Sequence, residues 1–589
     1  MKKILLSAII YIVIAACSNG KQNMESKTIA DMNPKFDKYK ANFIEELWKV
    51  YPGWASSQGY HKYDSVLVVP NDAERTKELA FSTANLDSLS TYDLARLSDN
   101  NKTDYYMIEN QLKSAQWVIN EEKAYQWDPA QYNISESFAD ILNGNCDSLD
   151  VRLRNFNLKM ANIPAYYEAA KKNIKNPTLE HTQLAIDQNL GGISVFEKDF
   201  HEALNKVHFG ENEKQMMEAN ARESVKAIKD YTTWLKNMKN ETPRSFRLGK
   251  ELYAKKFEFD IQSGYTVDQI YEKALAHKNE LHEKMFDLAN QLWAKYMGNE
   301  PKPTDKLLLT KQVIDKISLK HVQADSFQTA IEQVLPKLID FIKKKDLIYI
   351  DPSKPLVVRK EPGYMAGVAG ASISAPGPYD KNGNTYYNVG SLSGWDKEKA
   401  ESYLREYNYY VLQILCMHEA IPGHYTQLVY SNQSPSLIKS LFGNSAMIEG
   451  WAVYSERMML ENGYDDSPEM WLMYYKWNLR STCNTILDYS VHTKNMSKEE
   501  AMNLLMNEAF QQKTEAEGKW KRVSLTQVQL CCYFTGFTEI YDFREELKKQ
   551  MGDKFNLKKF HEKFLSYGSA PVKFIKELML AEMGIKSGC

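Results

Sequence analysis

The stretch VDQIYEKALAHKNELHEKMFDLANQLWAKYM, residues 267–297, decides the fold class. Its apolar residues from Leu281 to Leu292 follow one another at steps of four, three and four, which is the spacing of one face of an α-helix. Similar spacing is found at 42–50 and 326–342, and turn-forming pairs such as Asn176-Pro177 separate the apolar runs. From about residue 32 to about residue 345 the sequence therefore predicts one helix after another, in a mainly α protein.

The composition of the sequence changes near residue 351. Many Gly and Pro residues with β-forming residues between them occupy 355–395, where 356–358 and 385–389 are strand candidates. The segment KNGN at 381–384 is a hairpin turn signal, so we expect a small β-hairpin or sheet, after which helices resume and continue to the end. This pattern divides the mature chain into a helical N-terminal lobe at 32–350 and a C-terminal lobe at 351–589 that carries the sheet.

Composition bounds the class of protein. A length of 589 residues suggests two to four compact units or one large two-lobed enzyme. The 74 basic and 76 acidic residues give a formal net charge of -2, so there is no electrostatic case for binding nucleic acid, which needs a clustered basic surface. Seven cysteines are sparse for this length and show no CxxC spacing, so disulfides are not expected to form the framework.

The N-terminus has the features of an export signal. Two lysines precede an apolar run at 4–14, which is too short to span a bilayer, and small residues then lead directly to Cys17, as in a bacterial lipobox. We expect a signal peptide at 1–16, lipidation of Cys17 and a lipid-anchored tether at 17–31; the alternative is a plain cleaved signal with an incidental cysteine. This places the mature chain in the bacterial cell envelope, on the periplasmic face or outer surface of a bilayer. No later segment reaches about 18 uninterrupted apolar residues, so no other part is expected to cross a membrane.

The stretch LCMHEAIPGHYTQ at 415–427 carries candidate metal ligands inside an apolar helical run. Catalytic zinc takes three protein ligands, from histidine nitrogen or carboxylate oxygen, and keeps one position open for water. It also needs a nearby carboxylate that is not a ligand and accepts the proton of that water. His418 and His424 are the first two candidate ligands, and Glu419 is the candidate base.

The spacing of the two histidines departs from the helical arrangement, in which ligands four residues apart share one face. His424 lies about 240° around a straight helix from His418, so an ideal helix cannot present both side chains to one ion. Pro422 has no N–H for the carbonyl of His418, and its ring crowds that carbonyl. With Gly423 beside it, we expect the helix to bulge or break here and to bring His424 back to the face of His418.

A third candidate ligand follows in the next apolar run. Glu449 lies 25 residues after His424, an interval that allows one helix, a loop at 431–436 and entry into a second helix. Two antiparallel neighbouring helices can then supply ligands to the same ion. We expect one Zn²⁺ ion held by His418, His424 and Glu449, with cobalt and manganese as alternatives, because only ligand softness favours zinc. The other His-Glu pairs have no second histidine close downstream; they lie at 201–202, 282–283 and 561–562.

HEAIPGH at 418–424, followed by EGWA at 449–452, resembles the motifs of a widespread bacterial family classed as a domain of unknown function. That family is regarded as distantly related to the gluzincin peptidases, such as the neurolysin-like and angiotensin-converting-enzyme-like enzymes. The resemblance covers most of the mature chain and is sharpest from about residue 355 to about residue 545. It implies a large two-lobed, helical, gluzincin-like architecture, in which the hairpin before the metal helix lies beside a peptide substrate.

Further motifs of the same family are similar in this chain: Arg480, DYSVH at 488–492 and YFTG at 533–536. The chain departs from the family pattern at Tyr425, where a second histidine is common, and at 489–490, where Tyr-Ser replaces Thr-Gly. Neither position is an expected ligand, so the metal assignment stands. The departures bear on substrate preference, and Tyr425 is the candidate substrate contact.

The resemblance implies a zinc metallopeptidase that cleaves short peptides. In such an enzyme Glu419 takes the proton of the water that attacks an amide carbonyl. The oxyanion that develops needs hydrogen-bond donors, for which His492 and Tyr533 are candidates, and Arg480 is available for a substrate carboxylate. The structural alternative is that Arg480 pairs with Asp488 inside the protein and that Tyr533 belongs to the core.

Two other functions stay open. One is a non-catalytic metal- or peptide-binding lipoprotein of the same fold, which has no need of Glu419. The other is a zinc amidase that acts on a small amide other than a peptide, for which the same site serves equally well.

Overall fold

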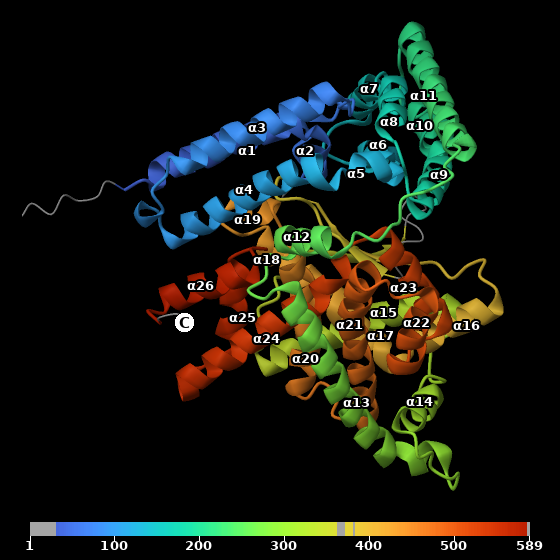
Figure 1. Ribbon diagram of the computed structural model, residues 1–589, viewed down its shortest axis with the longest axis vertical. Coiled ribbons are helices and arrows are strands. Elements are labelled where there is room, and N and C mark those ends of the chain that lie inside the picture. Colours follow the sequence, from blue (N-terminus) through green and yellow to red (C-terminus); the bar gives the residue numbers. More distant parts are fainter. Residues whose placement is uncertain (1–30, 362–370, 381–382, 586–589) are drawn as a thin grey trace, which may run out of the picture.

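The computed structural model describes residues 31–361, 371–380 and 383–585. These residues form a mainly α fold with one small sheet, as the sequence predicts (Figure 1). The predicted signal peptide, Cys17, nearly all of the tether, and positions 381 and 382 of the predicted turn lie outside the described residues. Within the described ranges, no helix combines the length and apolar character needed to cross a bilayer.

Fifteen helices precede the sheet in the described part of the chain. They are α1 (Asn33–Val50), α2 (Pro52–Ser57), α3 (Asp72–Ser90), α4 (Asp99–Trp117), α5 (Ala124–Trp127), α6 (Ser135–Asn143), α7 (Leu149–Met160), α8 (Ile163–Asn173), α9 (Leu179–Ser194), α10 (Phe200–Leu204), α11 (Glu211–Asn237), α12 (Lys250–Ile261), α13 (Val267–Met297), α14 (Lys306–Ile317) and α15 (Phe327–Lys345).

The helices after the sheet carry the candidate ligands. They are α16 (Lys397–Glu406), α17 (Tyr409–Glu419), α18 (His424–Ser431), α19 (Leu437–Leu441), α20 (Ser445–Glu461), α21 (Pro468–Thr493), α22 (Lys498–Asn503), α23 (Lys513–Leu525), α24 (Cys532–Met551), α25 (Leu557–Ser566) and α26 (Val572–Glu582).

The predicted long helix at 267–297 is confirmed as α13, over the same residues. A capping box opens it, since the Thr266 hydroxyl accepts from the Gln269 N–H and the Gln269 side chain accepts from the Thr266 N–H. Gly298, with φ of 63°, ends it. The apolar stripe, which includes Leu281 and Met285, is buried in the core that α13 shares with α21.

The sheet has three strands in the order β1-β3-β2: β1 (Leu356–Lys360), β2 (Ala371–Ser374) and β3 (Thr385–Val389). β1 runs parallel to β3 with Val358 opposite Tyr387, and β2 runs antiparallel to β3. The two predicted strands are confirmed, but the antiparallel partner of β3 is β2, which the sequence pattern did not single out. Ten residues, 375–384, join β2 to β3, and 381 and 382 of the predicted turn lie outside the described residues. The described part of this connection docks on α2, where a Cβ on Gly377 would lie 2.2 Å from the Gln58 carbonyl oxygen.

Buried apolar side chains form two clusters. One cluster lies within 132–235 and is formed by the helices from α6 through α11. Of these, α7, α8, α10 and α11 gather at one end of the molecule (Figure 1). The other unites α1, α4 and α12–α15 with the helices that follow the sheet. The cores thus divide the chain differently from the predicted lobes, because α12–α15 precede residue 350 and yet pack with the helices that carry the candidate ligands.

Candidate metal centre

The helix that carries His418 breaks where the sequence predicts. α17 ends at Glu419 and α18 begins at His424. Between them Ala420 leaves the helical conformation, with φ of -114° and ψ of -84°. The predicted irregularity is therefore confirmed, and it is a complete break rather than a bulge. It removes the angular mismatch of about 240° that a straight helix would impose on the two histidines.

The break is held by close backbone contacts. A Cβ on Gly423 would lie 1.8 Å from the carbonyl oxygen of His418, so the chain can return against its own helix only with glycine at this position. From the neighbouring helix α20, the Trp451 indole N–H donates to the Pro422 carbonyl at 2.9 Å. The EGWA motif therefore supplies a candidate ligand and also fixes the loop that presents another.

The three predicted ligands converge. The Nε2 atoms of His418 and His424 lie 3.7 and 3.3 Å from Oε2 of Glu449, and the two imidazole rings meet edge to face at 4.8 Å. Glu449 Oε2 is buried and has no hydrogen-bond partner among the described residues. Ligand atoms on a tetrahedral zinc ion, with bonds of about 2.1 Å, lie about 3.4 Å apart. The donor set and its spacing fit such an ion.

A further carboxylate orients the first ligand. Glu456 Oε1 lies 2.7 Å from Nδ1 of His418 and accepts a second hydrogen bond from Nε1 of Trp477 at 2.9 Å. With its proton on Nδ1, the imidazole keeps the Nε2 lone pair for a metal. Sequence reasoning missed Glu456, although it lies seven residues after Glu449, on the same face of α20 two turns later.

The buried charged groups of the centre shift one another's pKa values. Burial lowers the pKa of His418, but its contacts with Glu449 and Glu456 outweigh burial and raise that pKa to about 10. Burial raises the pKa of Glu449, yet His424 and His418 hold it well below its ordinary value. Glu419 ends α17 beside His418, and burial raises its pKa despite both histidines. The ligand pocket thus stabilises positive charge, and Glu419 binds a proton more readily than an ordinary carboxylate.

Close packing of two helices brings Tyr533 to the same place. A Cβ on Gly536 of α24 would lie 1.7 Å from the carbonyl oxygen of Ala446, and one on Gly450 of α20 would lie 2.4 Å from Gly536 Cα. Because both positions are glycine, α20 and α24 approach closely. The Tyr533 ring then lies 6.3 Å from the His418 ring and nearly parallel to it, at 19°.

The comparisons with known proteins bear on this set of residues. Residues 52–579 match a family described as "Bacterial protein of unknown function (DUF885)". The chain belongs to this family. No match is found among curated proteins.

Two solved structures resemble the DUF885 chain over nearly its whole length. One, a "putative lipoprotein of unknown function" from Shewanella oneidensis, is 53% identical, covers 92% of this chain and 99% of its own, and superimposes with a TM-score of 0.83. The other, a "putative lipoprotein" from Colwellia psychrerythraea, is 16% identical, covers 94% and 99%, and gives a TM-score of 0.76. The second likeness shows the shared fold.

Arg522 of the DUF885 chain is a site residue that sequence reasoning missed. Its Nη2 donates to the Tyr533 hydroxyl oxygen at 2.9 Å and to Gln529 Oε1 at 2.7 Å. A guanidinium only donates, so the Tyr533 oxygen accepts and its own hydrogen stays available for another acceptor in the centre. No local pattern marks this arginine, because its partner lies on another helix.

Arg480 forms an ion pair with Glu515 of α23 and lies 4.5 Å over the Trp477 ring. The alternative prediction, that Arg480 forms an internal ion pair with Asp488, is wrong about the partner, which is Glu515. Lys519 lies one turn after Glu515, with its Nζ 3.8 Å from the Glu515 carboxylate. Its side chain is 3% exposed, and burial together with Arg480 holds the pKa of Lys519 well below its ordinary value. Lys519 is thus a nearly buried amine whose neutral form is favoured and whose recorded ion-pair partner is Glu515.

Two predicted site residues make contacts elsewhere. His492 Nε2 bonds the carbonyl oxygens of Val523 and Thr526 at 3.0 and 3.1 Å. The Tyr425 hydroxyl donates to the Lys354 carbonyl at 2.6 Å. The structure therefore gathers the three candidate ligands, Glu419 and Tyr533 in one place, whereas the recorded hydrogen bonds of the His492 and Tyr425 side chains go to backbone carbonyls.

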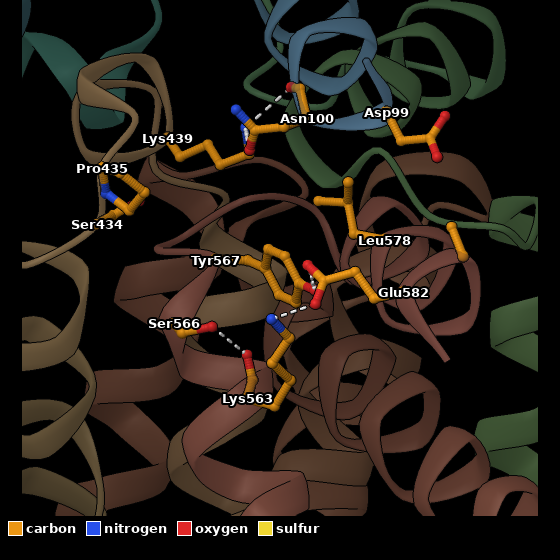
Figure 2. Close-up of a pocket in the computed structure, with 11 residues that line it drawn as sticks. Asp99, Asn100, Ser434, Pro435, Lys439, Lys563, Ser566, Tyr567, Leu578 and Glu582 are labelled. Carbon is orange, nitrogen blue, oxygen red and sulfur yellow. Dashed lines mark hydrogen bonds and ion pairs between the residues drawn. The ribbon is translucent and has the colours of Figure 1, made fainter. Parts of the chain in front are cut away.

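Two cavities lie beside these elements. One of about 510 Å³ opens between α4, α19, α25 and α26, where Lys563 and Tyr567 converge on Glu582 (Figure 2). Its charged residues all have ion-pair partners, Glu582 for Lys563, Asp104 for Lys439 and Lys102 for Asp99, and none of the predicted site residues lines it. Another of about 310 Å³ is lined in part by Gln529 and Cys532, the residues that flank the start of α24. The second cavity is the one that adjoins the Arg522–Tyr533 pair.

Proposed function

We propose that this DUF885 protein is a zinc-dependent metallopeptidase that cleaves short peptides at the bacterial cell envelope. One observation carries the proposal. His418, His424 and Glu449 converge across a broken helix, with a buried Glu449 oxygen that has no hydrogen-bond donor among the described residues and with the ring of His418 oriented by Glu456. A binding protein has no need of Glu419, whose pKa burial raises beside these ligands.

The residues divide the chemistry among them. A zinc ion at this site supplies Lewis acidity and lowers the pKa of a bound water toward neutrality. Glu419 accepts the proton of the attacking water, and its raised pKa suits it to hold that proton for the departing amine. Tyr533, whose oxygen already accepts from Arg522, donates its hydrogen to the oxyanion that develops on the scissile amide.

The basic residues of α23 support a peptide substrate with a free carboxylate. Arg480, the predicted carboxylate contact, is already neutralised by Glu515. Lys519 lies on the face of α23 between Glu515 and Arg522, at spacings of four and three residues. Glu515 pairs with Arg480, and Arg522 donates to Tyr533 of the metal centre. The C-terminal carboxylate of a short peptide beside Lys519 opposes the effect of burial on the pKa of this amine and accepts its hydrogen bonds.

The location rests on the sequence and on the relatives. The lipobox-like run that ends at Cys17 is the signal for lipid attachment, and both similar solved structures carry the word lipoprotein in their descriptions. We therefore place the enzyme on a membrane surface, held through Cys17.

The test uses a peptide library together with metal analysis of the purified protein. His424→Ala should lose one zinc equivalent and all cleavage, whereas Glu419→Gln should keep that zinc and lose at least about 10²-fold in kcat. His201→Ala, a change on α10 outside the site, is the matched control and should behave as wild type. Wild-type turnover in Glu419→Gln would remove the base from the mechanism. Zinc-dependent peptide binding without cleavage by the wild type would establish the binding-protein alternative instead.

A further inference from the structure

A second group of metal-ligating side chains lies outside the metal centre. His61, Asp64 and Cys146 each offer one ligand atom, and these atoms all lie within 4.8 Å of one another. His61 and Asp64 come from the short helix η1 (His61–Tyr63) and the residue after it, and Cys146 comes from the loop between α6 and α7. None of the three touches the candidate peptidase centre.

The carboxylate of this group is fixed before any ion arrives. Asp64 is 3% exposed. Its Oδ1 accepts from the Ser56 hydroxyl at 2.5 Å, and its Oδ2 lies 3.0 Å from Nδ1 of His61. Asp64 Oδ2 is thus held in a buried position, within the distance of an imidazole nitrogen at which two ligands of one ion lie.

The loop that carries Cys146 is also held in place. Arg152 Nη1 donates to the carbonyls of Ile141 and Leu142 at 2.9 and 2.6 Å, and its Nε donates to the carbonyl of Asp147 at 3.1 Å. Cys146 has a free thiol and is exposed, whereas the other free cysteines recorded in the described residues are buried. They are Cys416, Cys483, Cys531 and Cys532.

The charge around the thiol favours a cation. Burial, Asp64 and Asp147 raise the pKa of Cys146, with Arg152 acting in the opposite direction. Asp64 and Asp140 also face Lys159, which burial makes a weaker cation by lowering its pKa to about 8. Around Cys146 the acidic groups Asp64, Asp140 and Asp147 therefore outnumber the basic groups Arg152 and Lys159.

We propose that His61, Asp64 and Cys146 form a second zinc-type site that joins the two apolar cores. Thiolate, imidazole and carboxylate are all ligands of zinc, and three of them leave a fourth tetrahedral position for water. Ligand atoms on zinc lie about 3.4–3.8 Å apart, so a small movement of the exposed Cys146 side chain completes the set.

The position of the site defines its role. The segment before His61 packs with the core that contains the peptidase centre, through Ala55 of α2. The segment before Cys146 packs with the core of 132–235, through Phe138 and Ile141 of α6. An ion held by both segments cross-links the cores, and coordination releases the thiol proton to solvent.

Cobalt distinguishes the two sites by their ligands. The peptidase centre offers only nitrogen and oxygen, so a sulfur-to-cobalt charge-transfer band in the near ultraviolet reports the Cys146 site alone. The reduced wild-type protein, titrated with Co²⁺, should bind two equivalents and show this band. Cys146→Ser should bind one equivalent and show none, and His61→Ala should lose the band as well.

Matched variants separate this proposal from the proposed function. His424→Ala should bind one equivalent of Co²⁺ and retain the full band, and Cys146→Ser should keep wild-type turnover of any peptide substrate. A wild type without the band overturns the second site, whatever the result at His424. A band of wild-type intensity in Cys146→Ser overturns it equally, because another thiol would then be the ligand.

Discussion

Replacement of Glu456 by glutamine tests whether a carboxylate outside the ligand set tunes the metal centre. Both hydrogen bonds to Glu456, from His418 Nδ1 and Trp477 Nε1, arrive at Oε1, so the glutamine oxygen can accept both without a change in geometry. What is lost is the charge. A hydrogen bond to a charged group contributes about 1–2 kcal/mol more than a neutral one, which corresponds to about a 5- to 30-fold weaker Kd for the metal.

The new amide nitrogen adds a separate cost to Glu456→Gln. Glu456 Oε2 is buried and has no partner in the described residues, so the amide N–H groups that replace it meet no recorded acceptor. An unsatisfied buried donor costs about 1–3 kcal/mol, and the free energy of unfolding should fall by that amount. The variant is therefore expected to be both less stable and weaker in metal binding.

Chelator competition in the Cys146→Ser background measures Kd at the peptidase centre alone. Glu461→Gln is the matched control, because Glu461 also lies on α20 and accepts from two arginines, Arg457 at 2.6 Å and Arg544 at 2.9 Å. It should lower stability and leave the metal Kd unchanged. If Glu456→Gln binds zinc within twofold of its parent, the orientation of His418 by this carboxylate does not contribute to affinity and the reasoning is wrong.

Three further predictions follow from single contacts. In thermal melts, Gly536→Ala should lower the free energy of unfolding by at least about 1–3 kcal/mol and displace Tyr533, because its Cβ would lie 1.7 Å from the Ala446 carbonyl oxygen. Gly518→Ala on α23 is the control: no atom lies within 4 Å of its Cβ, so it should be neutral or stabilising. Lys519→Met should raise KM about 10- to 100-fold for peptides with a free C-terminus and leave amidated peptides unaffected in steady-state assays, and an equal effect on both would exclude a carboxylate contact. Burial lowers the pKa of His561 to about 4, against 6.5 when unfolded, so its neutral form supports stability fully above pH 6.5 and this support is lost as the pH falls toward 4. At pH 5 the loss is about 2 kcal/mol, and unfolding titrations of His561→Gln should show a shallower fall between pH 7 and pH 5.

The sequence predicted that the candidate metal ligands converge because the features that bring His418 and His424 together are local. His418, Pro422 and His424 lie within one short stretch, and the effect of proline on a helix follows from its missing N–H and its ring. Glu449 was predicted because it lies 25 residues after His424 in the next apolar run, an interval that fits a second, antiparallel helix. The long helix at 267–297 was predictable for a similar reason, since a regular apolar period determines a helix without reference to its neighbours.

The residues that support those ligands were not predictable in the same way. Glu456 and Arg522 act through contacts with residues 38 and 11 positions away in the chain, on other helices. Their partners depend on how α20, α23 and α24 pack, which apolar spacing does not determine. Arg480 was assigned the wrong internal partner for the same reason, because Glu515 comes from a helix whose position no motif specifies.

The DYSVH motif contributes to the centre in a way its sequence does not suggest. Asp488 accepts hydrogen bonds from the N–H groups of Val528 and Leu530 at 3.1 and 3.0 Å, and His492 bonds two carbonyls at the end of α23. Both side chains come from α21, so α21 holds the segment between α23 and α24 at both of its ends.

That segment contains a backbone conformation that needs support. Val528 has φ of 69°, in the left-handed region, which costs a β-branched residue about 1–3 kcal/mol. The hydrogen bond from its N–H to the buried Asp488 carboxylate offsets that cost and fixes the turn. Arg522 lies just before this turn and Tyr533 just after it, so their contact at 2.9 Å depends on the turn being held. His492 and Asp488 therefore position Tyr533, the proposed oxyanion donor, from a distance, through the turn that joins α23 to α24.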